Sequence, residues 1–432
     1  MKRCPGVLFL ILVMAQISGK ESTFALARNL PPLPQETARL ASLPEVHAAS
    51  AWFATHEREL AERQIQLSAI PSPPFGESQR AHWFRARFRE IGLEQVHIDE
   101  AGNVLGIREG TAKGAKYVAL TAHLDTVFPA GTRLDLRREG TRLLGPGIAD
   151  NGAGLTALLA LASALHAGRI RHSSPILFVA NVGEEGEGDL RGMRHLFHSA
   201  HWREAIAYTL VLDGGGTDTV VNEGLGSRRF EVTVHGPGGH SWTDFGTPNP
   251  IVILARAINK FASTPVPLDP RTTFNIGVIG GGTSVNAIPE TATMKVDMRS
   301  ASAAELDRLE ASLRDALAGA VADVKVRGDG RASLVSYELK PIGERPAAEL
   351  PPHAHILEVM KAVDAQLGIV SRLQRASTDA NIPISLGCEA VAIGAGGAGG
   401  GAHTLHEWYD PGNRELGLRR ILLALLTLAG VP

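Results

Sequence analysis

Four short apolar runs, each followed by polar residues, constrain the fold of this chain more than any other feature. Continuous stretches of Val, Leu, Ile and Ala at this length are typical of strands that are buried on both faces. Between the first two runs lies a segment rich in Ala and Leu, residues 154–167, which predicts a buried helix. Alternating strands and helices predict an α/β domain whose mostly parallel sheet is flanked by helices. The four runs are residues 117–121, 176–180, 208–212 and 390–393.

The pattern changes between Gly224 and Tyr337. Two segments there alternate polar and apolar residues as half-exposed strands do, and two others keep their apolar residues at helical spacing. The predicted order of strand, helix, strand, strand, helix and strand indicates a small α+β domain inserted into the larger one. The alternating segments are 229–235 and 291–299, and the helical segments are 251–261 and 306–317.

These patterns divide the chain into a discontinuous large domain and an inserted domain. We expect the large domain to comprise residues 28–224 and 338–432. The inserted domain is expected to comprise residues 225–337.

The first 27 residues are predicted to be a secretory signal peptide. Lys2 and Arg3 precede an apolar run, residues 7–15, which is shorter than the ~20 apolar residues that a membrane-spanning helix needs. A basic start, a short apolar core and small residues beyond it form the signal pattern, with cleavage after Gly19 or after Ala27. An uncleaved anchor is the alternative. We expect a secreted or periplasmic protein without stable membrane association after cleavage.

Composition excludes several classes of protein. The 43 Lys and Arg residues nearly balance the 45 Asp and Glu residues, so the chain lacks the basic character of a nucleic-acid-binding protein. Its two cysteines, Cys4 and Cys388, are too few for a fold held together by disulfides. Apolar residues make up 44% of the chain and charged residues 20%, which is ordinary for a globular protein and excludes disorder of the whole chain.

Residue types that bind metals follow the predicted strands. In parallel sheets, ligands gather beyond the carboxyl ends of the strands. His123 and Asp125 are separated by one residue on an extended strand, so both side chains point to one face, where a carboxylate can orient a metal-binding imidazole. The other candidates are Asp150 at the start of the predicted helix, Glu184 and Glu185 after the second run, Asp213 after the third, and His403 and His406 after the glycine-rich residues 394–401.

Each of these residues alone also has an ordinary structural explanation. Asp150 could cap the helix, adjacent glutamates at a strand end usually form a solvated turn, and Asp213 suits a turn. Their coincidence at the ends of four strands is improbable by chance. Two imidazoles, several carboxylates and one further carboxylate that acts as a base are what a site for two divalent metal ions requires. The sequence therefore predicts such a site.

Four motifs in this arrangement resemble those of a known family. They are Thr121-Ala122-His123-Leu124-Asp125, Gly147-Ile148-Ala149-Asp150-Asn151-Gly152, Glu184-Glu185-Gly186 and His403-x-x-x-Glu407. Their order resembles that of the co-catalytic di-zinc exopeptidase family, which includes carboxypeptidase G, tripeptidase T, acetylornithine deacetylase and succinyl-diaminopimelate desuccinylase. The resemblance extends from about Ala51 to Leu428, and it implies that the inserted domain is a lid and dimerisation domain.

The resemblance implies two Zn²⁺ ions per chain, with Co²⁺ or Mn²⁺ as substitutes. Asp125 would orient His123, and Glu184 would be the general base for a hydroxide that bridges the metals. The peptide bond that follows the bridging aspartate is cis in the family. The implied ligands are His123 and Asp213 for one ion, Glu185 and His403 for the other, and Asp150 for both.

Two histidines compete for the last ligand position. His403 stands four residues before Glu407, which matches the family's spacing, whereas His406 is adjacent to Glu407. Small residues at 399–402 directly precede His403 and let the backbone approach the metals closely. We therefore expect His403 to be the ligand and His406 to lie beside it or in the substrate pocket.

The resemblance also assigns residues of the inserted domain to the substrate. His240 would donate a hydrogen bond to the oxyanion, commonly from the partner subunit, which implies a homodimer through the lid domain. Many relatives have alanine just before this histidine, whereas this chain has Gly239. The remaining implied substrate-binding residues are Asn286, Arg299, Thr378 and Asp379.

Three functions are compatible with this sequence. The first is a secreted di-zinc metallopeptidase, an exopeptidase that hydrolyses small peptides or other substrates with a free carboxylate. The second is an N-acyl amino acid deacylase that uses the same site. The third, a binding protein on the same scaffold, would require the loss of a ligand or of the base, and the sequence lacks neither. The first is the function that we predict.

Overall fold

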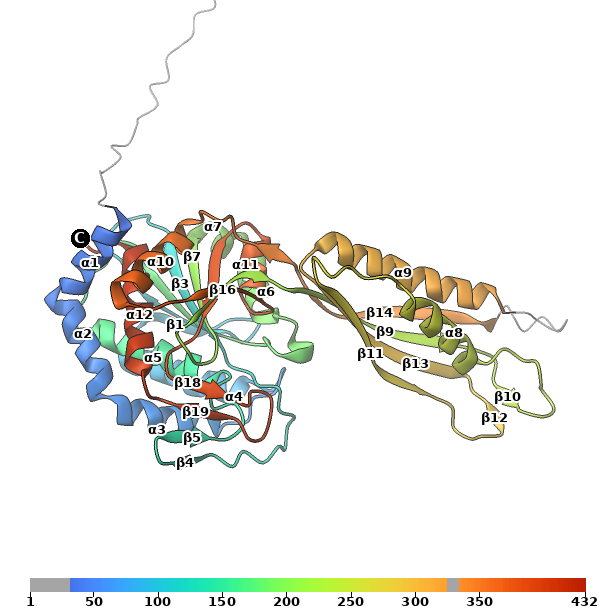
Figure 1. Cartoon of the computed structure of the whole chain (residues 1–432). Coiled ribbons are helices and arrows are strands. Elements are labelled where there is room, and N and C mark those ends of the chain that lie inside the picture. The colour runs from blue at the N-terminus through green and yellow to red at the C-terminus, as the bar shows by residue number, and fades with distance from the viewer. Residues whose placement is uncertain (1–31, 325–333) are drawn as a thin grey trace, which may run out of the picture. The chain divides into compact units, whose positions relative to one another are not determined.

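The four apolar runs form neighbouring strands at the centre of a nine-stranded sheet (Figure 1). The structure is a computed structural model that describes residues 32–324 and 334–432, so the predicted signal peptide lies outside the described residues. The four central strands are β6 (Ile176–Asn181), β3 (Tyr117–His123), β7 (Ile206–Leu212) and β17 (Glu389–Ile393). They are parallel to one another, as predicted.

Strands at both sides extend this parallel centre. Their pairing is antiparallel except for β16, which runs parallel to β8. They are β1 (Glu94–Ile98), β2 (Val104–Arg108), β8 (Thr219–Gly224), β15 (Ala348–Glu349) and β16 (Arg372–Ala376). The order across the sheet is β1-β2-β6-β3-β7-β17-β8-β15, with β16 beside β8.

Helices cover both faces of this sheet, so the large domain has three layers. Successive residues of β3 alternate between the two layers: Val118 and Leu120 belong to the larger core, and Ala119 belongs to the smaller one. The larger core also contains residues of α1 (Leu33–Ser42), α2 (Pro44–Thr55), α3 (Glu57–Ser68), α4 (Ser78–Ile91), α5 (Gly152–Ala167), α10 (His355–Leu367) and α12 (Arg414–Ala429). The smaller core involves α6 (Arg191–His198), α7 (Ala200–Ala205) and α11 (Asn381–Ser385). The predicted α/β fold is confirmed.

The inserted domain has the predicted order of strands and helices. Its antiparallel sheet has the order β11-β13-β9-β14, and two helices bury one face of it around a separate core. The elements are β9 (Gly226–His235), α8 (Pro250–Ala262), β11 (Thr272–Gly281), β13 (Thr291–Ser300), α9 (Ala303–Ala322) and β14 (Ser336–Arg345), with a short pair formed by β10 (Gly239–His240) and β12 (Ala287–Ile288). Strand β14 continues past Tyr337, so the sheet of the inserted domain reaches Arg345.

A small four-stranded sheet joins two segments that are distant in sequence. Its order is β18-β19-β5-β4, and it consists of β4 (Arg137–Glu139), β5 (Arg142–Leu144), β18 (Ala398–Gly400) and β19 (Trp408–Asp410). Strand β19 pairs with β5, with Trp408 opposite Leu144. This pairing brings the loop before α5, which carries Asp150, beside the loop that carries His403.

Among the described residues, no helix is both long and apolar enough to cross a membrane.

Candidate metal centre

Three neighbouring parallel strands place metal-binding residue types at one edge of the sheet. His123 is the last residue of β3, Asp213 directly follows β7, and Glu184 and Glu185 follow β6 by a few residues. Asp150 lies just before α5. Because the carboxyl ends of parallel strands share one edge, the register of these strands brings the side chains together.

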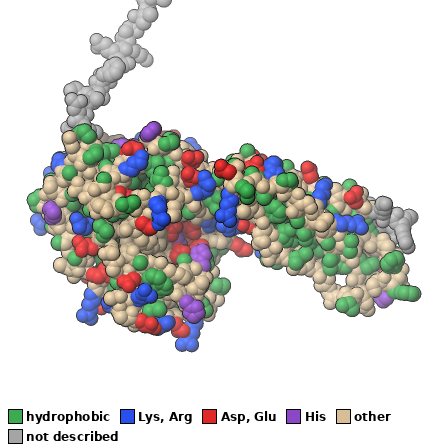
Figure 2. Space-filling view, in the orientation of Figure 1, with side chains coloured by type: hydrophobic (Ala, Val, Ile, Leu, Met, Phe, Trp, Pro, Cys, Tyr) green, Lys and Arg blue, Asp and Glu red, His purple; other side chains and the backbone are tan. Residues whose placement is uncertain are grey.

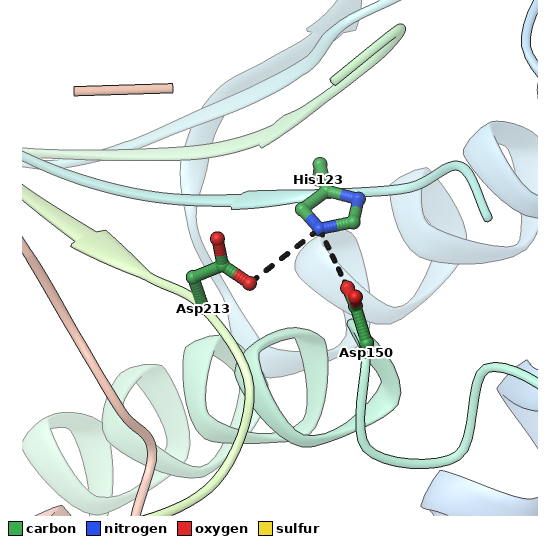
Figure 3. A group of neighbouring side chains, drawn as sticks. All are labelled: His123, Asp150 and Asp213. Atoms are coloured by element: carbon green, nitrogen blue, oxygen red, sulfur yellow. Dashed lines mark ion pairs between the residues drawn. The ribbon is translucent and has the colours of Figure 1, made fainter. Parts of the chain in front are cut away.

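The first group consists of His123, Asp150 and Asp213 (Figure 3). His123 Nε2 lies 3.1 Å from Asp150 Oδ1 and 3.7 Å from Asp213 Oδ1. Both carboxylates point toward the same imidazole nitrogen in Figure 3. The three candidate ligand atoms lie within 4.8 Å of one another, a separation that a single cation can bridge.

The second group consists of Asp150, Glu185 and His403. His403 Nε2 lies 3.1 Å from Asp150 Oδ2 and 3.2 Å from Glu185 Oε1. Asp150 therefore belongs to both groups and presents one carboxylate oxygen to each histidine. The structure brings together all five residues that the sequence singled out as ligands.

Asp125 contacts His123 through its main-chain oxygen, whereas the sequence predicted a contact through its carboxylate. Its main-chain oxygen accepts the hydrogen bond from His123 Nδ1 at 3.0 Å, whereas its carboxylate lies 3.6 Å from that nitrogen. A carbonyl oxygen can only accept, so Nδ1 carries the proton and Nε2 is left to bind a metal. The carboxylate accepts the main-chain N–H groups of Glu184 at 2.9 Å and Glu185 at 2.7 Å. Asp125 thus orients His123 and also fixes the loop that carries both glutamates.

The helix cap that the sequence allowed for Asp150 is instead provided by its neighbour Asn151. Asn151 Oδ1 accepts the N–H of Gly154 at 3.0 Å in the first turn of α5. Its Nδ2 donates to the main-chain oxygen of Leu212 at the end of β7. The bond between Asp150 and Asn151 is cis, as the family resemblance implied. With its neighbour acting as the cap, the side chain of Asp150 is available for the site.

The chemistry of these residues fits two divalent cations. Asp150 Oδ1 is buried and has no hydrogen-bond partner among the described residues, although His123 Nε2 is 3.1 Å away. In the protein without metal, hydrogen bonds with Asp150 and Glu185 raise the pKa of His403 to about 10. Metal binding has to displace that proton, because an imidazole binds a metal only in its neutral form. Two imidazoles and three carboxylates form a donor set typical of zinc and similar divalent ions.

The sequence pattern of peptidase family M20/M25/M40 matches residues 119–427, which include both groups of ligands. The chain belongs to this family. It is thus a hydrolase that acts on peptide or amide bonds, and the predicted family relationship is confirmed. The match also covers the inserted domain.

Curated proteins with similar sequences include one from a bacterium and one from a fungus. An uncharacterized protein of Bacillus subtilis is 25% identical over 361 residues, which cover 79% of this chain and 91% of that protein. A probable carboxypeptidase of Aspergillus clavatus is 31% identical over 277 residues, which cover 58% of this chain and 59% of that protein.

Solved structures share the fold of this M20/M25/M40 member at low identity. A tripeptidase from Staphylococcus aureus has a TM-score of 0.71 at 21% identity, over 86% of this chain and 98% of that one. A di-peptidase from Saccharomyces cerevisiae has a TM-score of 0.69 at 12% identity, over 90% and 99%. A dinuclear metal-binding peptidase of the M20 family from Bacillus subtilis has a TM-score of 0.63 at 16% identity, over 88% and 99%.

Glu184, the residue expected to act as the base, has a partner that sequence reasoning missed. Arg345 Nη1 donates to Glu184 Oε1 at 2.9 Å, and Arg345 Nη2 donates to the main-chain oxygen of Glu184. Both side chains are buried. Burial raises the pKa of Glu184 well above its ordinary value, and the positive charge of Arg345 opposes this shift. Arg345 ends a half-exposed strand of the lid, and no local pattern distinguishes it from an ordinary surface arginine.

The lid residues that the sequence assigned to the substrate form contacts within the lid. His240 Nδ1 accepts the main-chain N–H groups of Trp242 and Thr243. Arg299 Nε donates to Asp297 Oδ2 at 2.7 Å, and Ser284 Oγ donates to Asn286 Oδ1 at 2.6 Å. Within residues 32–324 and 334–432, none of these three residues belongs to the two groups of candidate ligands.

The last two residues assigned to the substrate differ in what surrounds them. Asp379 is fully buried, and its Oδ2 accepts a hydrogen bond from Asn181 Nδ2 at 2.6 Å at the end of β6. Burial raises the pKa of Asp379 to about 7. Thr378 is also buried, and its hydroxyl accepts the N–H of Ala380. The structure therefore places Asp379 against the strand that leads to Glu184.

Proposed function

We propose that this chain is an exopeptidase that hydrolyses an amide bond of small peptides or other carboxylate-bearing substrates, with two Zn²⁺ ions bound by the five candidate ligands. The observation that carries the proposal is the position of Asp150, which presents one oxygen to each of two groups of ligands. Two dications bring a charge of +4 against −3 from the three ligand carboxylates. The net positive charge favours an attacking oxygen anion and a polarised carbonyl.

Glu184 is the residue that moves the proton in this proposal. The metal ions that these five ligands would hold would polarise the scissile carbonyl and lower the pKa of a bound water toward about 7. Glu184 lies beside the ligands, because it forms a group with His123 and Glu185 whose candidate atoms lie within 4.8 Å. It takes the proton of the attacking water and passes it to the leaving amine.

Arg299 and Asn286 support a substrate with a free carboxylate. A guanidinium offers two parallel hydrogen bonds to a carboxylate, and Arg299 stands on β13 with an exposed side chain. Asn286 lies in the turn before β12, which pairs with the strand that carries His240. We assign Arg299 to the substrate carboxylate and Asn286 to the substrate carbonyl.

The proposed function is tested with a panel of dipeptides and N-acyl amino acids assayed with Zn²⁺, Co²⁺ and Mn²⁺. We expect chelation to abolish activity, added metal to restore it, and dipeptides to be cleaved faster than acylated amino acids. Hydrolysis of acylated amino acids alone would instead establish the deacylase. Full activity in protein that holds fewer than two metal ions per chain would contradict the two-metal site.

A homodimer through the lid domain is part of the proposal. The lid exposes several large hydrophobic side chains, and Figure 2 shows hydrophobic side chains gathered over it. Trp242 and Phe245, close to His240 in sequence, are 84% and 74% exposed. Exposed apolar side chains of this size favour contact with another protein surface. The other exposed large hydrophobic residues of this domain, among the described residues, are Ile251, Val252, Val266, Leu268, Val278, Ile279, Val285 and Leu334.

Replacement of His240 by alanine is expected to reduce turnover by about 100–1,000-fold, because it removes one hydrogen-bond donor to the oxyanion. Metal content and folding should not change, since His240 is exposed and, in the described part of the chain, its side chain bonds only to main-chain N–H groups of the turn that follows it. If His240 acts across the dimer, mixing His240→Ala with inactive Glu184→Gln should restore part of the activity. Verified heterodimers without any recovery would favour a donor that acts within its own subunit, or no such donor at all.

We also propose that residues 1–27 direct export. The basic start and the short apolar run support this proposal. Amino-terminal sequencing of exported protein is expected to begin at Lys20 or at Arg28. A chain that retains Met1 in the cytoplasm would contradict it.

A further inference from the structure

Glu407 has no role in the proposed function so far, yet its side chain is fully buried beside the metal centre. Among residues 32–324 and 334–432, no Lys, Arg or His forms an ion pair with it. A buried carboxylate without a countercharge destabilises a fold unless hydrogen bonds compensate for lost water. The hydrogen bonds of Glu407 therefore indicate its structural role.

All three hydrogen bonds to the Glu407 carboxylate come from the main chain of one loop. Oε1 accepts the N–H of Ala149 at 2.8 Å and that of Asp150 at 2.7 Å, and Oε2 accepts the N–H of Gly147 at 2.8 Å. The main-chain oxygen of Glu407 accepts a fourth N–H, that of Gly145. One residue thus fixes four main-chain positions between β5 and α5.

The local conformation of the loop makes these bonds possible. Gly147 has a φ of +72°, a left-handed conformation that glycine adopts without steric penalty. The chain turns there, so that N–H groups on both sides of the turn reach the same carboxylate. Asp150 lies three residues after Gly147. Its main-chain N–H donates to Glu407, and the next residue, Asn151, donates to the main-chain oxygen of Leu212 at the end of β7.

Glu407 also lies on the segment that carries the other histidine. It stands four residues after His403 and directly before β19, which pairs with β5. The residue therefore joins the loop of the shared ligand to the loop of a ligand that belongs to only one group. The facing atoms of Asp150 and His403 on these two loops are 3.1 Å apart.

We propose that Glu407 is a positioning residue that holds Asp150 in place between the two groups of ligands and keeps His403 in register with it. The proposal rests on the proposed two-metal function. Because Asp150 is shared, a change at Glu407 should weaken both metals, unlike the loss of a ligand that serves one metal. Replacing residues that support metal ligands typically weakens metal binding by about 10–100-fold.

The test is Glu407→Gln, with Zn²⁺ affinity measured at both sites by competition with a chromophoric chelator. Glutamine keeps the volume and one acceptor oxygen, but its NH₂ group faces a main-chain N–H, so two donors meet. We expect Zn²⁺ to bind about 10–100-fold more weakly at both sites. Glu407→Asp keeps the charge on a shorter side chain and should give an intermediate affinity.

Glu389→Gln is the matched control. Glu389 is a partly buried carboxylate that accepts one main-chain N–H, that of Ile356, and it stands at the start of β17, the opposite end of the strand from the site. This variant should bind two Zn²⁺ ions with unchanged affinity. Unchanged affinity in Glu407→Gln, or weakening at one site alone, would overturn the positioning role while the two-metal function stands.

Two further outcomes are also decisive. Wild-type protein that does not bind two Zn²⁺ ions would refute the proposed function itself, whatever the variants show. Failure of both Glu407→Gln and Glu407→Asp to fold would make Glu407 a requirement of the fold, and the positioning proposal would be wrong. Thermal unfolding of the metal-free variants separates this case from a change in metal affinity.

Discussion

Glu184→Gln is expected to lower turnover by about 100–10,000-fold while both metal ions remain bound, because general acid–base catalysis contributes a factor of this size. Glutamine cannot take up the proton of the attacking water or return it to the leaving amine. The amide oxygen can still accept the hydrogen bond from Arg345 that Glu184 Oε1 accepts at 2.9 Å. The fold and the ligands, including the adjacent Glu185, should therefore be retained.

The measurement is the rate constant for turnover, together with the metal content of the purified variant. Glu187→Gln is the control, since it makes the same chemical change in the same loop on a side chain that is 76% exposed. Glu187→Gln should keep wild-type turnover. A near-normal rate for Glu184→Gln would remove Glu184 from the role of general base, and a loss of metal would show that it acts as a ligand instead.

Most of the fold could be predicted because its local signals agree with its global structure. The apolar runs that become β3, β6, β7 and β17 are buried on both faces, and such strands contain few polar residues to obscure them. The boundary of the inserted domain was harder to place. Strand β14 alternates exposed and half-buried residues from Ser336 to Lys340 and continues to the buried Arg345, so the predicted boundary at Tyr337 falls inside a strand.

The ligands could be predicted from the sequence because the carboxyl ends of neighbouring parallel strands lie side by side, so that residues at these ends are neighbours in space. The supporting roles of Arg345 and Glu407 were not predicted, because their contacts join positions that are distant in sequence. Arg345 lies 161 residues from Glu184, and Glu407 lies 257 residues from Asp150. The capping role of Asn151 was not predicted, because the sequence allowed Asp150 to be the cap of α5. The structure places the cap one residue later, at Asn151.

His403→Ala is expected to reduce the metal content from two ions per chain to one and to abolish most activity. His403 Nε2 faces Asp150 and Glu185, and among the described residues it belongs only to the second group of ligands. The first group would keep His123, Asp150 and Asp213. The side chain of His403 is 55% exposed, so the substitution should leave no cavity in a core.

His406→Ala is the matched control, because it removes another exposed imidazole from the same loop. Among the described residues, His406 is absent from both groups, and its main-chain N–H donates to the hydroxyl of Thr404. We expect this variant to retain both metals, as measured by elemental analysis after gel filtration. The reverse pattern would make His406 the ligand. His403→Ala is expected to lose one metal ion, whereas Glu407→Gln is expected to bind both metal ions more weakly. The two variants therefore distinguish a residue that binds one metal from a residue that positions Asp150, the ligand shared by both metals.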